Sequence, residues 1–205
     1  MFQGAYSSQL LEEAVNQFAS LPGIGRRTAL RLALHILDEP EENVMRFTGA
    51  FTSLKQNIHV CGRCFMISDN EICPICDDRT RDRSIICVVE NIRDVLSIES
   101  TGQYRGFYHI LGGIISPIDG IGPSDLHIAE LVARLKEGSV REVILALSTS
   151  MEGETTSYYL YKQISVFPVN VTTIARGVGF GDDLEYADEL TLGKSIVNRH
   201  PFNTI

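Results

Sequence analysis

The sequence predicts an α+β chain built from several parts, and three observations lead to this prediction. Apolar residues recur at helical spacing through residues 8–54, whereas short strand and helix patterns alternate from residue 84 onward. Four cysteines lie close together between these two stretches. We therefore expect a helical region over residues 1–54, a small cysteine-rich module over 55–83, an α/β domain over 84–179 and a C-terminal tail over 180–205.

The first part should contain three helices. Ser8 precedes apolar residues at helical spacing, and the segment Leu21–Gly25 (LPGIG) should end the helix that begins there. A second helix is expected over Arg26–Leu37. A third is expected over Glu41–Gln56, after Pro40 at its start.

The second part alternates between strands and helices. Ser84–Glu90 (SIICVVE) is a continuous apolar run, which is typical of a strand buried on both faces. Further strands are expected over Phe107–Leu111, Glu142–Leu147 and Val169–Ala175, with helices over Ile92–Glu99, Pro123–Lys136 and Glu154–Ser165. This alternation predicts right-handed βαβ units around a mostly parallel sheet.

The composition is that of an ordinary globular protein. Of the 205 residues, 44% are hydrophobic and 21% are charged, which excludes a disordered or low-complexity chain. No apolar run approaches the length needed to cross a membrane, and residues 1–10 lack the basic start and apolar core of a secretory signal. We expect a cytoplasmic protein that makes no contact with a membrane.

The charge balance limits where nucleic acid could bind. The chain carries 26 acidic and 18 basic residues, a formal net charge of −8. This balance argues against a protein that binds nucleic acid over its whole surface. The acidic excess falls mainly after residue 83, so a local nucleic-acid site is expected in the first part of the chain.

The four clustered cysteines have the spacing of a metal site. Two Cys-x2-Cys pairs separated by eight residues place four thiolates on two tight turns, a tetrahedral set that Zn²⁺ prefers. Four sulfur ligands leave no open position for water, so we expect one structural zinc per chain. The alternatives are two disulfides, free thiols or an iron–sulfur cluster. The predicted ligands are Cys61, Cys64, Cys73 and Cys76.

A glycine turn followed by arginines predicts contact with DNA. Gly23 and Gly25 allow a sharp turn and bring backbone N–H groups close to an anion, and the helix that follows adds its own N–H groups. Arg26, Arg27 and Arg31 supply positive charge beside this turn. The segment resembles a helix-hairpin-helix motif, which grips the sugar–phosphate backbone without reading sequence. The alternative is a purely structural helical turn.

Acidic residues mark the ends of two predicted strands. They are Glu90, Asp94, Glu152 and Glu154. The alternating half resembles a Toprim domain, whose catalytic members hold Mg²⁺ with a strand-end glutamate and a later pair of aspartates. Ser148 and Ser150 stand at the positions of that pair, and hydroxyls are poor Mg²⁺ ligands. We therefore expect a broken catalytic site without Mg²⁺ and a protein-docking surface. A solvated acidic patch or a residual Mg²⁺ site are the alternatives.

Taken in order, these segments resemble the RecR family of bacterial recombination mediators. The resemblance rests on LPGIGRRTALRLA, the four cysteines, TRDRSIICVVEN, YRGFYHILGGIISPIDGIGPSDL, the EGE motif and LEYADELTLG. The family often has Asn and Pro within the stretch that reads Leu147–Ser150 here, so this loop is expected to differ. The tail segment Leu184–Glu189 resembles the family's Walker-B-like motif. Because no Walker A loop occurs, we expect no ATP hydrolysis.

The resemblance implies a non-enzymatic repair factor. Members of the family act with RecO and, in many bacteria, RecF to help load RecA at single-strand gaps, in RecBC-independent recombinational repair. The resemblance also implies self-association into dimers and ring-shaped tetramers that clamp DNA near the nucleoid. Two other functions stay open at this point: a Mg²⁺-dependent Toprim nuclease or topoisomerase, and a protein adaptor that does not bind DNA.

Overall fold

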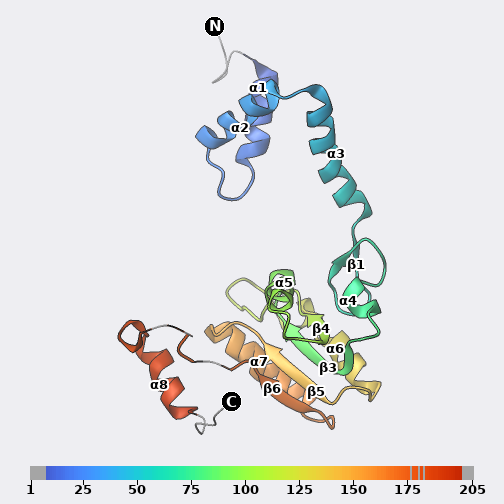
Figure 1. The fold of residues 1–205 in the computed structure, drawn as a ribbon, viewed down its shortest axis with the longest axis vertical. Helices are drawn as coiled ribbons and strands as arrows, with labels where there is room; N and C mark the ends of the chain where they lie inside the picture. Colours follow the sequence, from blue (N-terminus) through green and yellow to red (C-terminus); the bar gives the residue numbers. More distant parts are fainter. Residues whose placement is uncertain (1–7, 176, 180, 182, 200–205) are drawn as a thin grey trace. The chain divides into compact units, whose positions relative to one another are not determined.

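A computed structural model describes residues 8–175, 177–179, 181 and 183–199 (Figure 1). The chain divides into two units, Met1–Ile58 and His59–Ile205. The start of the expected helical region and both ends of the expected tail lie outside the described residues. None of the described helices is long and apolar enough to cross a membrane.

The first unit contains the three expected helices. They are α1 (Gln9–Ala19), α2 (Arg26–Asp38) and α3 (Glu41–Asn57). The Ser8 hydroxyl caps α1 by accepting a hydrogen bond from the Leu11 backbone N–H at 3.3 Å. Val15 of α1 packs against Ala29 and Ala33 of α2, and all three are buried. The small side chains of α2 let the two helices approach closely.

The cysteine-rich module is built from very short elements. Strands β1 (His59–Val60) and β2 (Ile67–Ser68) form an antiparallel pair, and α4 (Pro74–Asp77) is a single helical turn. Pro74 occupies the first turn of α4, where its missing N–H costs nothing. The module's buried centre consists of its four cysteines together with Phe107.

A parallel four-stranded sheet forms the second half of the chain, as the alternating pattern predicts. Its strand order is β4-β3-β5-β6, and all three strand pairs are parallel. The strands are β3 (Asp82–Val89), β4 (Gly106–Ile110), β5 (Glu142–Ala146) and β6 (Asn170–Thr173). Because β3 is central, its last four residues are fully buried, which explains its uninterrupted apolar sequence.

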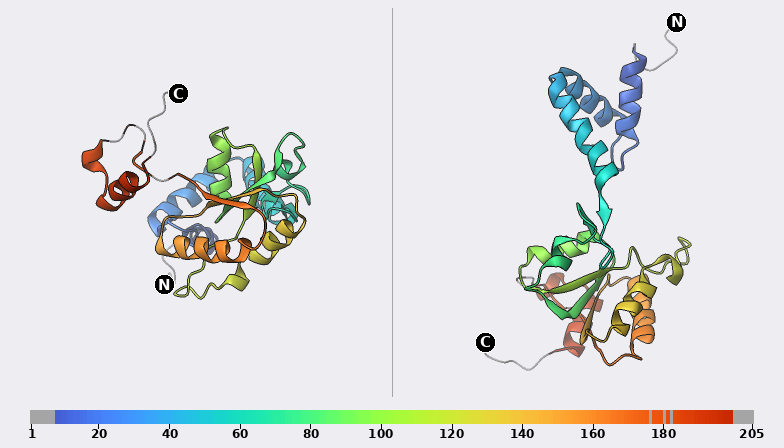
Figure 2. Two further views of the ribbon diagram at one scale, coloured as in Figure 1. Left: turned by 90° about the horizontal axis from the view of Figure 1, so that it is seen from below. Right: turned by 90° about the vertical axis from the view of Figure 1, so that its right-hand side faces the viewer.

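Helices cover both faces of this sheet (Figure 2). On one face, α6 (Ile128–Lys136) and α7 (Met151–Ile164) bury Leu131 and Leu160 against Ile86 and Val143. On the other face, α5 (Ile92–Ser100) contributes Val95 to a cluster that includes strand residues of β3 and β4. Cys87 lies in this second cluster, and burial raises its pKa to about 12, so its thiol is protonated.

The expected helix over Pro123–Lys136 is wrong in its first part. The chain forms a short 3-10 turn, η1 (Pro123–Asp125), and then becomes extended at Leu126 before α6 begins. Leu126 is buried, and the His127 backbone N–H donates to the Leu111 carbonyl at 3.0 Å. These two contacts hold the segment against the end of β4, which a continuous helix could not do. Helix α7 also starts three residues earlier than expected, because Ser150 caps it.

The described part of the tail contains a 3-10 turn, η2 (Leu184–Tyr186), and helix α8 (Glu189–Val197). The Asp188 carboxylate caps α8 by accepting a hydrogen bond from the Thr191 backbone N–H at 2.9 Å. The Walker-B-like segment therefore folds as a turn and a helix cap, with Leu184 and Tyr186 exposed.

Candidate metal centre and nucleic-acid interface

The four predicted ligands converge on one point. The sulfur atoms of Cys61, Cys64, Cys73 and Cys76 all lie within 4.8 Å of one another, and the four residues are buried. Within the described residues, they are the only group of three or more Cys, His, Asp or Glu side chains close enough to share one ion. No disulfide joins them.

The size of this cluster fits one tetrahedral zinc ion. Zinc–sulfur bonds of about 2.3 Å place sulfur ligands about 3.8 Å apart in a tetrahedron. The Sγ atoms of Cys64 and Cys73 lie 3.5 Å apart. Hydrogen bonding to Cys73 raises the pKa of Cys64 to about 12, and hydrogen bonding to Cys64 and Cys73 raises the pKa of Cys76. Hydrogen bonding to Cys64 and Cys76 instead lowers the pKa of Cys73. Without a cation Cys64 and Cys76 would hold protons, which metal binding must displace.

Backbone hydrogen bonds shape both turns that carry the cysteines. The Cys61 N–H donates to the Met66 carbonyl at 2.7 Å, and the Phe65 N–H donates to the Cys61 carbonyl at 3.0 Å. The Cys76 N–H points at the Cys73 sulfur at 3.4 Å. This last N–H group suits a metal-bound thiolate, so the turn at Cys73 is arranged for ionised sulfur.

Phe65 joins the module to the sheet, a role that sequence reasoning missed. Its backbone has a φ of +66°, which is rare for a non-glycine residue. This conformation stacks its ring on His127 with centroids 3.6 Å apart. The Ile110 N–H of β4 also donates to the Cys64 carbonyl at 3.0 Å. The metal module and the sheet therefore share one packed boundary.

His109 is a buried residue whose role the sequence did not reveal. Its Nδ1 accepts a hydrogen bond from Arg134 Nη1 at 3.3 Å, since a guanidinium can only donate. Its Nε2 must therefore carry the proton and donate to the His127 carbonyl at 2.6 Å. Burial lowers the pKa of His109 to about 3, so the ring is neutral at physiological pH.

The glycine turn opens the beginning of α2 to an anion. Gly23 has a φ of +78°, a left-handed conformation that favours glycine, and the Ile24 N–H closes the turn on the Leu21 carbonyl. Gly25 is the N-cap of α2, and no side chain caps the free N–H groups there. These groups and the positive end of the helix dipole are available to a phosphate.

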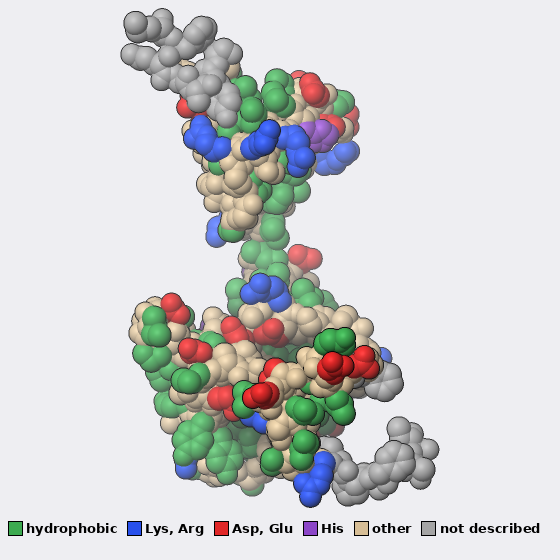
Figure 3. All heavy atoms as spheres, turned by 90° about the vertical axis from the view of Figure 1, so that its left-hand side faces the viewer, with side chains coloured by type: hydrophobic (Ala, Val, Ile, Leu, Met, Phe, Trp, Pro, Cys, Tyr) green, Lys and Arg blue, Asp and Glu red, His purple; other side chains and the backbone are tan. Residues whose placement is uncertain are grey.

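Arg26, Arg27 and Arg31 are all exposed on α2 beside this turn. Arg27 and Arg31 are one helical turn apart and line the same shallow surface pocket. None of the three forms an ion pair within the described part of the chain. Figure 3 shows Lys and Arg side chains gathered across this unit, whereas Asp and Glu side chains predominate on the visible face of the second unit.

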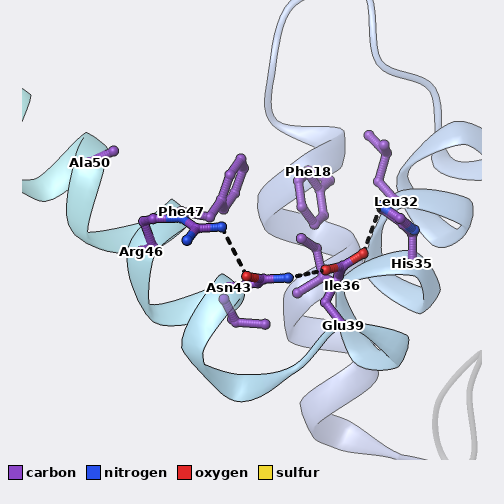
Figure 4. Close-up of a pocket in the computed structure, with 10 residues that line it drawn as sticks. Phe18, Leu32, His35, Ile36, Glu39, Asn43, Arg46, Phe47 and Ala50 are labelled. Carbon is purple, nitrogen blue, oxygen red and sulfur yellow. Dashed lines mark hydrogen bonds and ion pairs between the residues drawn. The ribbon is translucent and has the colours of Figure 1, made fainter.

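An apolar groove lies between the three helices of the first unit (Figure 4). It encloses about 530 Å³, and Phe18, Ile36 and Phe47 line it from α1, α2 and α3 respectively. A polar chain crosses it: Arg46 donates to Asn43 at 2.9 Å, and Asn43 donates to Glu39 at 2.7 Å. Helix α3 buries none of its residues.

The predicted acidic residues follow two adjacent strands. Glu90 comes directly after β3, and Glu152 and Glu154 lie in the first turn of α7, which follows β5. Strands β3 and β5 are parallel neighbours, with Val89 opposite Ala146. The three glutamates therefore follow the carboxyl ends of the two strands, at the same edge of the sheet. Burial raises the pKa of Glu90, and the nearby Asp94 carboxylate raises it further.

Asp94 also has a structural role. Its carboxylate accepts a hydrogen bond from the Asn91 N–H at 3.0 Å, while the Asn91 side chain accepts one from the Arg93 N–H at 2.9 Å. This reciprocal capping fixes the start of α5 directly after Glu90.

The two serines at the positions of the Toprim aspartates form a compact loop. The hydroxyls of Ser148 and Ser150 lie 3.1 Å apart, and Ser150 accepts a hydrogen bond from the Gly153 N–H at 3.1 Å. A Cβ atom on Gly153 would lie 2.2 Å from the Ser148 carbonyl oxygen. Glycine is therefore required at the centre of the Glu152–Glu154 motif, because α7 lies directly against this loop.

Replacing Gly153 by alanine is expected to lower the free energy of unfolding by about 1–3 kcal/mol, because backbone atoms must move to admit the methyl group. Gly49 is the matched control, since it lies in α3 with no atom near its Cβ position. Gly49→Ala should raise the free energy of unfolding by about 0.5–1 kcal/mol. Urea titrations measure both. If Gly153→Ala had the same free energy of unfolding as the wild type, this would contradict the close packing of α7 on the loop that contains Ser148 and Ser150.

Comparisons with known proteins cover nearly the whole chain. Family models match residues 11–54 (the helix-hairpin-helix of RecR), 58–78 (the four-cysteine zinc finger domain of RecR), 84–175 (a Toprim domain) and 177–200 (the C-terminal part of RecR). A protein from Porphyromonas gingivalis named "Recombination protein RecR" is 57% identical over 97% of this chain and 96% of its own length. Proteins of the same name from Parabacteroides distasonis and Flavobacterium johnsoniae are 56% and 54% identical, over 97% and 96% of this chain and 95% and 96% of their own lengths.

Proposed function

Because the chain belongs to the RecR family of recombination proteins, we propose that it is a non-catalytic DNA clamp that mediates recombinational repair. In this role it acts with RecO and RecF to help load RecA at single-strand gaps, independently of RecBC. The observation that supports the proposal most strongly is the first unit's open glycine turn, which is flanked by three exposed arginines without carboxylate partners in the described chain.

The contact with DNA is expected to be independent of sequence. Backbone N–H groups at the start of α2 and the guanidiniums of Arg27 and Arg31 suit phosphate oxygens, which carry no sequence information. The chain as a whole is acidic, so its positive charge must be concentrated at the DNA contact. We place this activity in the cytoplasm, at the nucleoid.

Self-association of the chain would bring several of these DNA contacts together in one assembly. Phe47, Phe51 and Leu54 of α3 lie on one face of the helix and are 44%, 59% and 54% exposed, and Phe47 also lines the apolar groove of the same unit. An apolar helix face of this kind is covered in a stable assembly. We propose that copies of the chain cover it in a dimer or a tetrameric ring. Several weak phosphate contacts then act together on one DNA molecule.

We propose that RecO and RecF dock on the acidic edge of the sheet, which is formed by Glu90, Asp94, Glu152 and Glu154. Glu90 and Glu152 can be tested together, leaving Asp94 in place because it caps α5. Glu90→Ala with Glu152→Ala is expected to weaken RecO binding about tenfold or more, through lost charge complementarity, and to leave DNA affinity unchanged. Calorimetry with purified RecO and fluorescence anisotropy with DNA measure the two effects.

Glu71→Ala with Glu130→Ala is the control for this experiment, since it removes the same charge from two exposed positions elsewhere in the second unit. It should leave RecO binding unchanged. Equal RecO affinities for both double variants would mean that the acidic edge is only a solvated surface.

A further inference from the structure

A small cavity lies where the cysteine module meets the sheet and α6. It encloses about 250 Å³, and its lining includes Cys76, Phe107, Glu137 and the three arginines Arg63, Arg83 and Arg134. Arg83 stands over the Phe107 ring, 5.9 Å from its centroid. Three guanidiniums around one small cavity repel one another, so this site requires negative charge close by.

Arg134 is the member of this set that the fold holds in place. It is half-buried on α6, whereas Arg63 and Arg83 are exposed. Its Nη1 donates to the Tyr108 carbonyl at 2.8 Å and to His109 Nδ1 at 3.3 Å, both on β4. Both acceptors are neutral, and no carboxylate of the described chain lies within 4.0 Å of the Arg134 guanidinium. A partly buried cation therefore lacks an ordinary ion-pair partner.

The cysteine cluster can supply the missing charge. Cys76 lines the same cavity as Arg134. Four thiolates around one Zn²⁺ carry two net negative charges, which are also costly to bury. Together with Glu137, that centre balances the three arginines without any further anion.

We propose that Arg134 is a positioning residue for the metal centre, which provides the counter-charge of the zinc–tetrathiolate group and ties that group to β4. This inference rests on zinc occupancy of the four cysteines. The metal ligands lie on residues 61–76, but the charge that stabilises their ionised form comes from α6, about 60 residues later in the chain. Metal binding and the packing of α6 on the sheet are thereby coupled.

The test uses the full chain, with zinc content per chain measured first by atomic emission. Zinc affinity is then measured by competition with a chromogenic chelator, for the wild type, Arg134→Gln, Arg134→Lys and Arg141→Gln. Arg141 is the matched control, because its side chain is 80% exposed and it does not line the cavity. Arg134→Gln is expected to weaken zinc binding about 10–100-fold, as loss of an outer-shell partner does. Arg134→Lys should fall between Arg134→Gln and the wild type, because it keeps the charge without the forked geometry.

Spectra of the Co²⁺-substituted proteins show whether the variants still form a tetrahedral four-sulfur site. We expect the same bands for the wild type and Arg134→Gln, reached at higher Co²⁺ concentration in the variant. If Arg134→Gln does not fold, Arg63→Gln tests the same charge balance from an exposed position, with a smaller loss of zinc affinity.

Four results would overturn the inference. Zinc affinity of Arg134→Gln equal to that of Arg141→Gln would remove Arg134 from the metal centre. Equal losses in Arg134→Gln and Arg134→Lys would assign the effect to hydrogen-bond geometry instead of charge. If inorganic phosphate stabilises the wild type but not an Arg134→Gln protein of unchanged zinc affinity, the cavity is an anion site. A wild type without zinc would overturn the metal assignment itself, while leaving the DNA contact of the first unit untouched.

Discussion

Replacing Cys73 by serine is expected to abolish metal binding and to unfold the cysteine module. The module has two strands of two residues and a helix of four, so its own apolar contacts cannot stabilise it. Zinc binding contributes about 10–16 kcal/mol of apparent free energy in isolated zinc-finger peptides, and most of that gain would be lost. Atomic emission gives the zinc content, and hydrogen exchange shows whether residues 59–78 lose protection.

Cys87→Ala provides the control for this substitution. Cys87 is also buried, but it lies in the sheet and outside the metal cluster. The variant should retain one zinc per chain and lose about 1 kcal/mol of stability from the smaller side chain. If Cys73→Ser kept both the zinc content and the protection of the wild type, the four cysteines would not be a metal site.

Replacing Arg27 and Arg31 together by alanine is expected to reduce DNA affinity and its dependence on salt. Each phosphate contact adds about 0.7–0.9 to the slope of log K against log salt, so two lost contacts lower the slope by about 1.4–1.8 per subunit. At 0.1 M salt, each lost contact corresponds to a loss on the order of tenfold in affinity. Because both side chains are exposed, α2 should remain folded. Anisotropy titrations at several salt concentrations measure the slope.

Arg93→Ala with Arg141→Ala is the matched control for this double substitution. It removes two exposed arginines from the second unit and should change the salt slope little. If the two double variants had the same slope as the wild type, the glycine turn of the first unit would not be the DNA contact.

The elements of this fold follow from periodicity and local chemistry. The three N-terminal helices and the parallel sheet agree with the sequence pattern, because apolar spacing and buried apolar runs report these elements directly. The segment before α6 was not predictable in the same way. Leu126 and His127 leave the helical path to contact the end of β4, and such tertiary contacts have no local sequence signal.

The functional site also combines residues that the sequence pattern identifies with residues that only tertiary contacts reveal. The spacing of the four cysteines is enough to identify them as ligands, and the fold brings their sulfur atoms together. The residues around them could not be identified in this way. Phe65, His109 and Arg134 look like ordinary core or helix residues, and their roles depend on contacts with residues 18 or more positions away. The predicted DNA and partner residues are exposed or half-buried, and their roles remain predictions.

The central claim is that this chain holds DNA through its first unit while the serine-containing edge of its sheet performs no strand cleavage. Incubating the zinc-loaded protein with gapped circular DNA and Mg²⁺ tests both halves in one sample. We predict a stable protein–DNA complex at low salt and DNA strands that stay intact over many hours. Nicked or relaxed DNA that accumulates in proportion to the protein, and disappears when Mg²⁺ is chelated, would contradict the account.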